Sequence, residues 1–116
     1  MMSWPKTPRG MYAEIRRRYF ESTLPSAKEI IFLWVEDMAE ATTIDTRSEI
    51  ASVTQNEEGM WVMSLNKGLA GFPALLYFTI AHECVHIKRP EIDHGSKDWN
   101  REVRLLQGKG LMLRCF

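Results

Sequence analysis

The chain has 116 residues, of which 45% are hydrophobic and 26% charged, as is typical of one globular domain with a sizeable core. Lysine plus arginine and aspartate plus glutamate number 15 each, which excludes a strongly charged molecule that would be steered to polyanions or to a membrane surface. The N-terminus lacks a secretion-signal pattern, and no run reaches the roughly 18–20 apolar residues of a membrane span. We therefore expect a single cytoplasmic domain over residues 1–116, with no membrane partner and no structural disulfide between Cys84 and Cys115.

The first element that the sequence predicts is an amphipathic helix. Thr7 can serve as its N-cap, and Pro8 suits the first helical position. Met11, Ile15 and Tyr19 recur at four-residue spacing and form an apolar stripe for the core. We expect Leu24-Pro25 to stop this helix, because proline disfavours helical backbone at the residue before it.

Residues 26–40 carry two conflicting signals. Ser26 and Glu29 have the spacing of a capping box, which predicts a helix. The run Ile30–Val35 is rich in β-branched and aromatic residues, which favours a buried strand. We expect a strand over 28–35, followed by an irregular or helical turn through Met38–Thr43.

A β-hairpin is predicted next. The segments Glu49–Thr54 and Met60–Leu65 are strand-like, and a polar loop ending at Gly59 joins them. Apolar side chains alternate along the second segment, so one of its faces should pack on the core. We expect this second segment to be an exposed edge strand, along which an extended peptide can bind.

Two further helices complete the predicted fold. Ala74–Ile87 is apolar nearly all round and predicts a buried central helix, which Pro90 ends. Ser96 can cap a last helix that ends near Gly108. Its inner face is lined by Trp99, Val103 and Leu106. The expected architecture is α+β, with a small antiparallel or mixed sheet packed on the N-terminal, central and C-terminal helices.

The central helix contains the pattern H-E-x-x-H at His82-Glu83-Cys84-Val85-His86. Histidines four positions apart lie on one face of a helix, so both imidazoles can reach one metal ion at roughly 2.0–2.1 Å. Glu83 lies beside the first histidine, where it can act as general base on a metal-activated water. Cys84 is expected to pack in the core. The pattern predicts a zinc-dependent metallopeptidase, a hydrolase that binds one Zn²⁺ per chain.

A catalytic zinc site needs a third protein ligand and an open fourth position. His94 lies eight residues after His86, beyond a turn bounded by Pro90, and is the ligand that we favour. Three carboxylates remain as alternatives, namely Glu91, Asp93 and Glu102. Trp99 is expected to anchor the loop that carries His94. Tyr77 and Arg89 are candidates for a second donor to the oxyanion.

The H-E-x-x-H pattern, followed by His94-Gly95 and Trp99, resembles the SprT-like metallopeptidases, which pair this pattern with a later His-Gly and an aromatic residue. The resemblance extends upstream, to Tyr19-Phe20 before Leu24-Pro25 and to Ser64-Leu65-Asn66 before Leu69. It implies a zincin-like fold, zinc held by His82, His86 and His94, Glu83 as general base, and a protein or peptide substrate.

The resemblance covers a catalytic core only. Many members of the family continue into a zinc ribbon of paired cysteines, whereas the end of this sequence holds Cys115 alone. Spartan-type members of the family degrade proteins crosslinked to DNA, so the resemblance makes a nucleic-acid partner possible. The balanced net charge of this sequence does not support such a partner. A second hypothesis is a zinc-stabilised binding or regulatory module with weak or no proteolytic activity. The presence of Glu83 favours the enzyme, because a structural zinc site needs no base.

Overall fold

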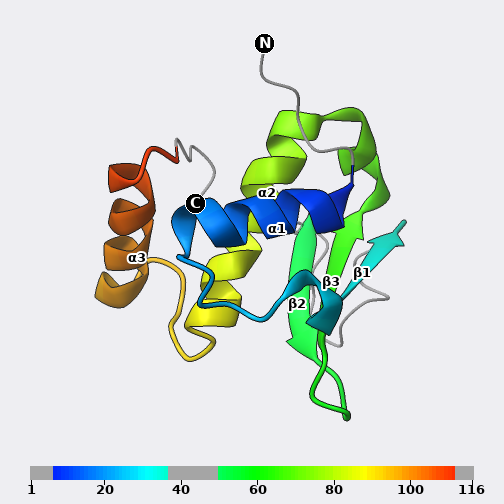
Figure 1. Ribbon diagram of the computed structural model, residues 1–116, viewed down its shortest axis with the longest axis horizontal. Coiled ribbons are helices and arrows are strands. Elements are labelled where there is room, and N and C mark those ends of the chain that lie inside the picture. Colours follow the sequence, from blue (N-terminus) through cyan, green and yellow to red (C-terminus); the bar gives the residue numbers. More distant parts are fainter. Residues whose placement is uncertain (1–6, 37–49, 112–116) are drawn as a thin grey trace.

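The structure is a computed structural model that describes residues 7–36 and 50–111 (Figure 1). This part of the chain forms three α-helices, three β-strands and two short 3₁₀ helices, which follow one another as α1 (Pro8–Tyr19), η1 (Ala27–Glu29), β1 (Ile30–Val35), β2 (Ala51–Gln55), β3 (Trp61–Asn66), η3 (Lys67–Gly71), α2 (Pro73–Lys88) and α3 (Lys97–Gly108). The expected α+β class is confirmed. The turn expected at Met38–Thr43 and the residue Cys115 lie outside the described residues.

Helix α1 begins as predicted and ends earlier than predicted. The Thr7 hydroxyl accepts a hydrogen bond from the Gly10 N–H at 3.0 Å, which makes Thr7 the N-cap. The helix ends at Tyr19, well before Leu24-Pro25, so the expectation that this dipeptide stops it is wrong. The chain turns away through Glu21 and Ser22, whose φ angles of 53° and 59° are left-handed and incompatible with a continuing α-helix.

Both signals in residues 26–35 prove to be correct, one after the other. The Ser26 N–H donates to the Glu29 carboxylate at 2.7 Å, and the single turn η1 forms between them. Strand β1 then begins at Ile30, two residues later than expected. The capped turn at Ser26–Glu29 therefore leads directly into this strand.

The sheet is mixed, with the order β1-β3-β2. The predicted hairpin is confirmed: β2 pairs antiparallel with β3, and Val53 lies opposite Met63. Strand β1 pairs parallel with the other side of β3, where Phe32 lies opposite the same Met63. The expectation that Met60–Leu65 forms an exposed edge is therefore wrong, because β3 is the central strand and β1 and β2 are the edges.

The core lies where the helices meet the sheet. Helix α2 packs on α1 and on β2, and in Figure 1 α3 stands on the side of these helices away from the sheet. Tyr12, Ile15, Met63 and Ile80 are among the fully buried side chains. Cys84 is fully buried as well and packs in this core, as expected. Nowhere in residues 7–36 and 50–111 is a helix long and apolar enough to cross a bilayer.

Candidate metal centre

Helix α2 positions two of the predicted site residues. It is buried on most sides, as its nearly uniform apolar sequence predicts, and the Arg89 N–H closes its last turn on the Val85 carbonyl at 2.8 Å. His82 and His86 are half-buried on the face that α3 covers, with ring centroids 5.1 Å apart. Glu83 lies between them in the sequence and is only 5% exposed. Its carboxyl group is therefore held inside the fold.

A short loop after α2 brings His94 back to this helix. The Ile92 N–H bonds to the Arg89 carbonyl at 3.3 Å, and the Ser96 N–H bonds to the Asp93 carbonyl at 3.2 Å. Gly95 has a φ of 78°, a left-handed conformation that a side chain would strain. These tight turns direct the chain from the end of α2 to the start of α3 with His94 facing α2.

The three imidazoles converge on one point. The Nε2 atom of His94 lies 2.9 Å from Nε2 of His86 and 3.1 Å from Nε2 of His82. A ligand atom from each histidine falls within 4.8 Å of those of the other two. Two nitrogens bound to zinc at tetrahedral angles are separated by about 3.3 Å. The three side chains thus have the separation of ligands that share one metal ion.

The electrostatics of the cluster suit a cation. The pKa of His82 is lowered to about 4, mainly by burial and in addition by the neighbouring His86 and His94. Burial likewise lowers the pKa of His86 to about 4, with His94 as the second cause. Both side chains are therefore neutral near pH 7, which is the form that binds a metal.

Trp99 packs against the whole cluster. It is buried in the first turn of α3, and its ring centroid lies 5.0 Å from that of His82, 4.9 Å from His86 and 4.5 Å from His94. Ser96 fixes the start of this helix by accepting a hydrogen bond from the Trp99 N–H at 3.2 Å. Trp99 is thus the expected anchor of the His94 loop.

The carboxylates considered as third ligands lie outside the histidine group. Glu102 is buried, but its Oε2 atom accepts a hydrogen bond from Lys88 Nζ at 2.8 Å. Glu91 pairs with Arg89, whose Nε lies 2.6 Å from its Oε1. Asp93 is exposed in the loop. Of the candidates in this region, the structure therefore brings only His94 to His82 and His86.

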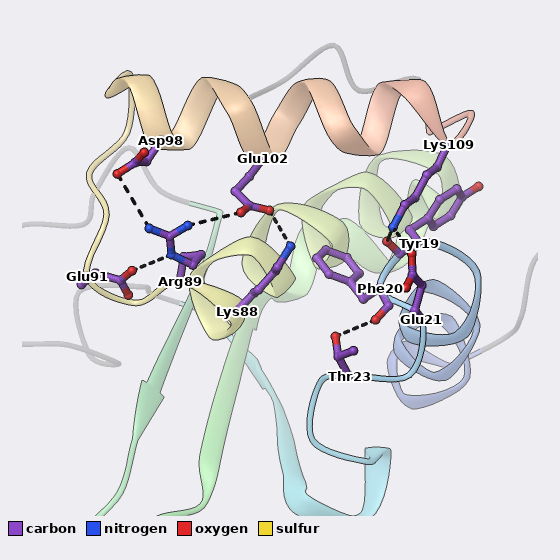
Figure 2. A network of polar contacts seen from close by, with 10 residues as sticks. All are labelled: Tyr19, Phe20, Glu21, Thr23, Lys88, Arg89, Glu91, Asp98, Glu102 and Lys109. Carbon is purple, nitrogen blue, oxygen red and sulfur yellow. Dashed lines mark hydrogen bonds and ion pairs between the residues drawn. The ribbon is translucent and has the colours of Figure 1, made fainter.

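The two side chains considered as oxyanion donors have other partners. Tyr77 is buried, and its side chain is hydrogen-bonded to Tyr19 on α1; burial is the main cause that raises its pKa. The guanidinium of Arg89 is paired with carboxylates on the loop and on α3 (Figure 2). Sequence reasoning missed this ion-pair network, because neither Lys88 nor Glu102 signals its partner by spacing.

No protein-family model, curated protein or solved structure matches this chain. The fold and the site therefore define its class by themselves. It is an α+β domain in which three histidines, two from a buried helix and one from the loop after it, can hold a metal ion.

Proposed function

We propose that this protein is a zinc-dependent metallopeptidase of the SprT-like type, with a zincin-like arrangement around its central helix. One observation carries the proposal: the Nε2 atoms of His82, His86 and His94 lie together at the separation of metal ligands. The sequence resemblance to SprT-like metallopeptidases involves the same three histidines and adds Glu83 and Trp99.

The donor set favours zinc over other divalent ions. Three neutral imidazoles suit a borderline metal, whereas magnesium and calcium prefer oxygen ligands. A zinc ion with three protein ligands supplies a Lewis acid whose fourth position is open to water or substrate. His82 and His86 come from a rigid buried helix, and His94 comes from a loop held by Trp99. The protein thereby sets the direction of all three ligands.

Glu83 would handle the protons of peptide hydrolysis. It would accept a proton from the attacking water and pass it to the leaving amine, as a general base and then a general acid. Glu83 lies in the turn of α2 that carries the two ligands. Because it is buried, few bulk water molecules can reach its carboxylate and compete with the attacking water. The proposed substrate is a protein or peptide.

A zinc-stabilised binding or regulatory module remains the second candidate. The packing of Trp99 edge-on to His82 and tilted against His86 favours it, because a metal ion bound beside this contact would strengthen the link between α2 and α3. Such a module needs the histidines and has no use for Glu83. Substitution of Glu83 therefore separates the two candidates.

Metal analysis of the purified protein, of Glu83→Gln and of His94→Ala tests the site. We expect about one zinc per chain in the first two proteins and a loss or weakening of zinc binding in His94→Ala. Asp93→Ala, one residue before the ligand, is the matched control and should keep its zinc. Full zinc occupancy in His94→Ala would refute the three-histidine site.

Proteolysis of casein by the zinc-loaded protein tests the reaction. We expect activity in the unsubstituted chain and at least a hundredfold loss in Glu83→Gln, in line with the contribution of a general base, ~10²–10⁴. Equal activity in both proteins would remove Glu83 from its role. Zinc binding without cleavage in the unsubstituted chain would favour the binding module.

A further inference from the structure

A network of ion pairs joins the end of α2 to the first half of α3 (Figure 2). Lys88 is the last residue of α2, and Arg89 follows it. The Nζ atom of Lys88 lies 2.8 Å from Oε2 of Glu102, and Nη1 of Arg89 lies 3.5 Å from Oε1 of the same carboxylate. One carboxylate on α3 thus pairs with two consecutive cationic side chains at the end of α2, the helix that carries His82 and His86.

Arg89 extends this network to both ends of the His94 loop. Its Nε atom lies 2.6 Å from Oε1 of Glu91, which is in the loop. Its Nη2 atom lies 3.7 Å from Oδ2 of Asp98, in the first turn of α3. The loop leaves α2 at Arg89 and enters α3 after Ser96, so these pairs close its base.

Burial distinguishes Glu102 from the other carboxylates of the network. Its side chain is 7% exposed, whereas that of Glu91 is 61% exposed and that of Asp98 is 50% exposed. A surface ion pair contributes little, but a buried carboxylate must keep its cationic partners, because its desolvation is not otherwise compensated. The charged groups of Lys88 and Arg89 must consequently stay beside the Glu102 carboxylate.

We propose that Glu102 is a positioning residue of the metal centre. It does not bind the metal. By holding Lys88 and Arg89, it fixes the end of α2 relative to α3 and keeps the intervening loop in the shape that directs His94 toward His82 and His86. The inference rests on the metal site proposed above, and it assigns a role in that site to a carboxylate outside the histidine group.

Glu102→Gln tests this role, because the amide keeps the shape of the side chain and removes its charge. Glu21→Gln is the control: it breaks the 3.0 Å ion pair with Lys109, which joins the other end of α3 to the segment after α1. Zinc affinity by competition with a chelator, the visible spectrum of the cobalt-substituted protein, and the nuclear Overhauser contacts between the His94 and Trp99 rings in the metal-free protein are measured for each variant.

We expect Glu102→Gln to weaken zinc binding by about tenfold, as loss of a residue supporting the ligands does. Its cobalt spectrum should lose tetrahedral intensity, and its contacts between the His94 and Trp99 rings should weaken. Glu21→Gln should match the unsubstituted protein in all three measurements. A folded Glu102→Gln that keeps the original affinity, spectrum and ring contacts overturns the proposal and leaves Glu102 with a role in stability alone.

Two further results keep the inferences separate. If the unsubstituted protein binds no metal, the proposed function fails, and the ring contacts of the metal-free variants still decide whether Glu102 positions His94. If Glu102→Gln does not fold, Arg89→Gln takes its place, since the Arg89 side chain is 35% exposed and tolerates an amide. Weakened zinc binding and weakened ring contacts in Arg89→Gln support the proposal, and unchanged values overturn it.

Discussion

The indole of Trp99 meets the imidazole of His94 edge to face, with 4.5 Å between the ring centroids and 77° between the planes. His94 is exposed, whereas Trp99 is buried. The contact therefore links an exposed loop residue to the core of the protein. It gives the third candidate ligand a fixed support that the loop backbone alone would not provide.

Removal of this support should affect both stability and metal binding. Trp99→Ala is expected to cost about 3–5 kcal/mol in the free energy of unfolding, as truncation of a buried aromatic residue does. Urea unfolding in a chelator measures this cost, and a zinc titration of the folded fraction should show weaker binding. Trp34→Ala is the control, since Trp34 is 42% exposed, and it should cost about 1 kcal/mol with zinc affinity unchanged. Equal zinc affinity in both variants would contradict the role given to Trp99.

The caps of α1 and α3 offer a matched pair of substitutions. Ser96→Ala and Thr7→Ala each remove one side-chain acceptor from a helix N-terminus, and each should lower the free energy of unfolding by about 1 kcal/mol. Ser96 also ends the His94 loop, so only Ser96→Ala should weaken zinc binding. Thermal unfolding and chelator competition measure the two effects. A loss of affinity in Thr7→Ala as large as in Ser96→Ala would show that the effect is not local.

Gly95 and Gly59 provide a second pair. Both have left-handed backbones, with φ angles of 78° and 84°, and neither meets a nearby atom where a Cβ would be added. Alanine at either position should therefore cost about 1 kcal/mol through backbone strain alone. Gly95 follows His94, whereas Gly59 lies in the hairpin, so Gly95→Ala should lower zinc affinity and Gly59→Ala should not. If both variants bind zinc as the original does, the conformation of Gly95 has no bearing on the site.

The metal-free protein should lose stability in mild acid. The pKa of His82 and that of His86 are lowered from 6.5 to about 4 on folding. Between these values the unfolded chain binds more protons than the folded one, so the free energy of unfolding falls as the pH falls from 6.5 to 4. Each histidine contributes at most roughly 3 kcal/mol to this loss.

Urea unfolding in a chelator at several pH values measures this dependence. The double variant His82→Gln, His86→Gln is the control that isolates the two side chains, and its stability should change less over the same range. If the original and the double variant depend on pH in the same way, other groups cause the acid sensitivity.

Local signals in the sequence predicted local structure well. The sequence predicts Thr7 and Ser96 as caps, and the structure confirms both, because a cap and the N–H group that it binds lie within one turn of each other. The sequence favours His94 because it is the third histidine and follows a loop bounded by Pro90 that can turn the chain back, and the structure brings it to the H-E-x-x-H helix. These features require no knowledge of distant segments.

Features that depend on distant segments were missed. Parallel pairing of β1 with β3 makes Met60–Leu65 central, and nothing in the two strand sequences specifies that neighbour. The ion pair of Glu102 with Lys88 forms only where α2 and α3 pack together, so neither helix sequence alone indicates it. One local feature was missed as well: the chain leaves α1 after Tyr19 through Glu21, which adopts a left-handed conformation without being glycine.

The spacing of the histidines along the chain has a consequence for the order of folding. His82, His86 and His94 fall within thirteen residues, so one short loop and one helix bring them together. The sheet instead requires Ile30 and Trp61, the first residues of two parallel strands, to pair across the whole segment between them. The histidine cluster can therefore assemble before the sheet closes, and a metal ion can capture a chain that is still only partly folded.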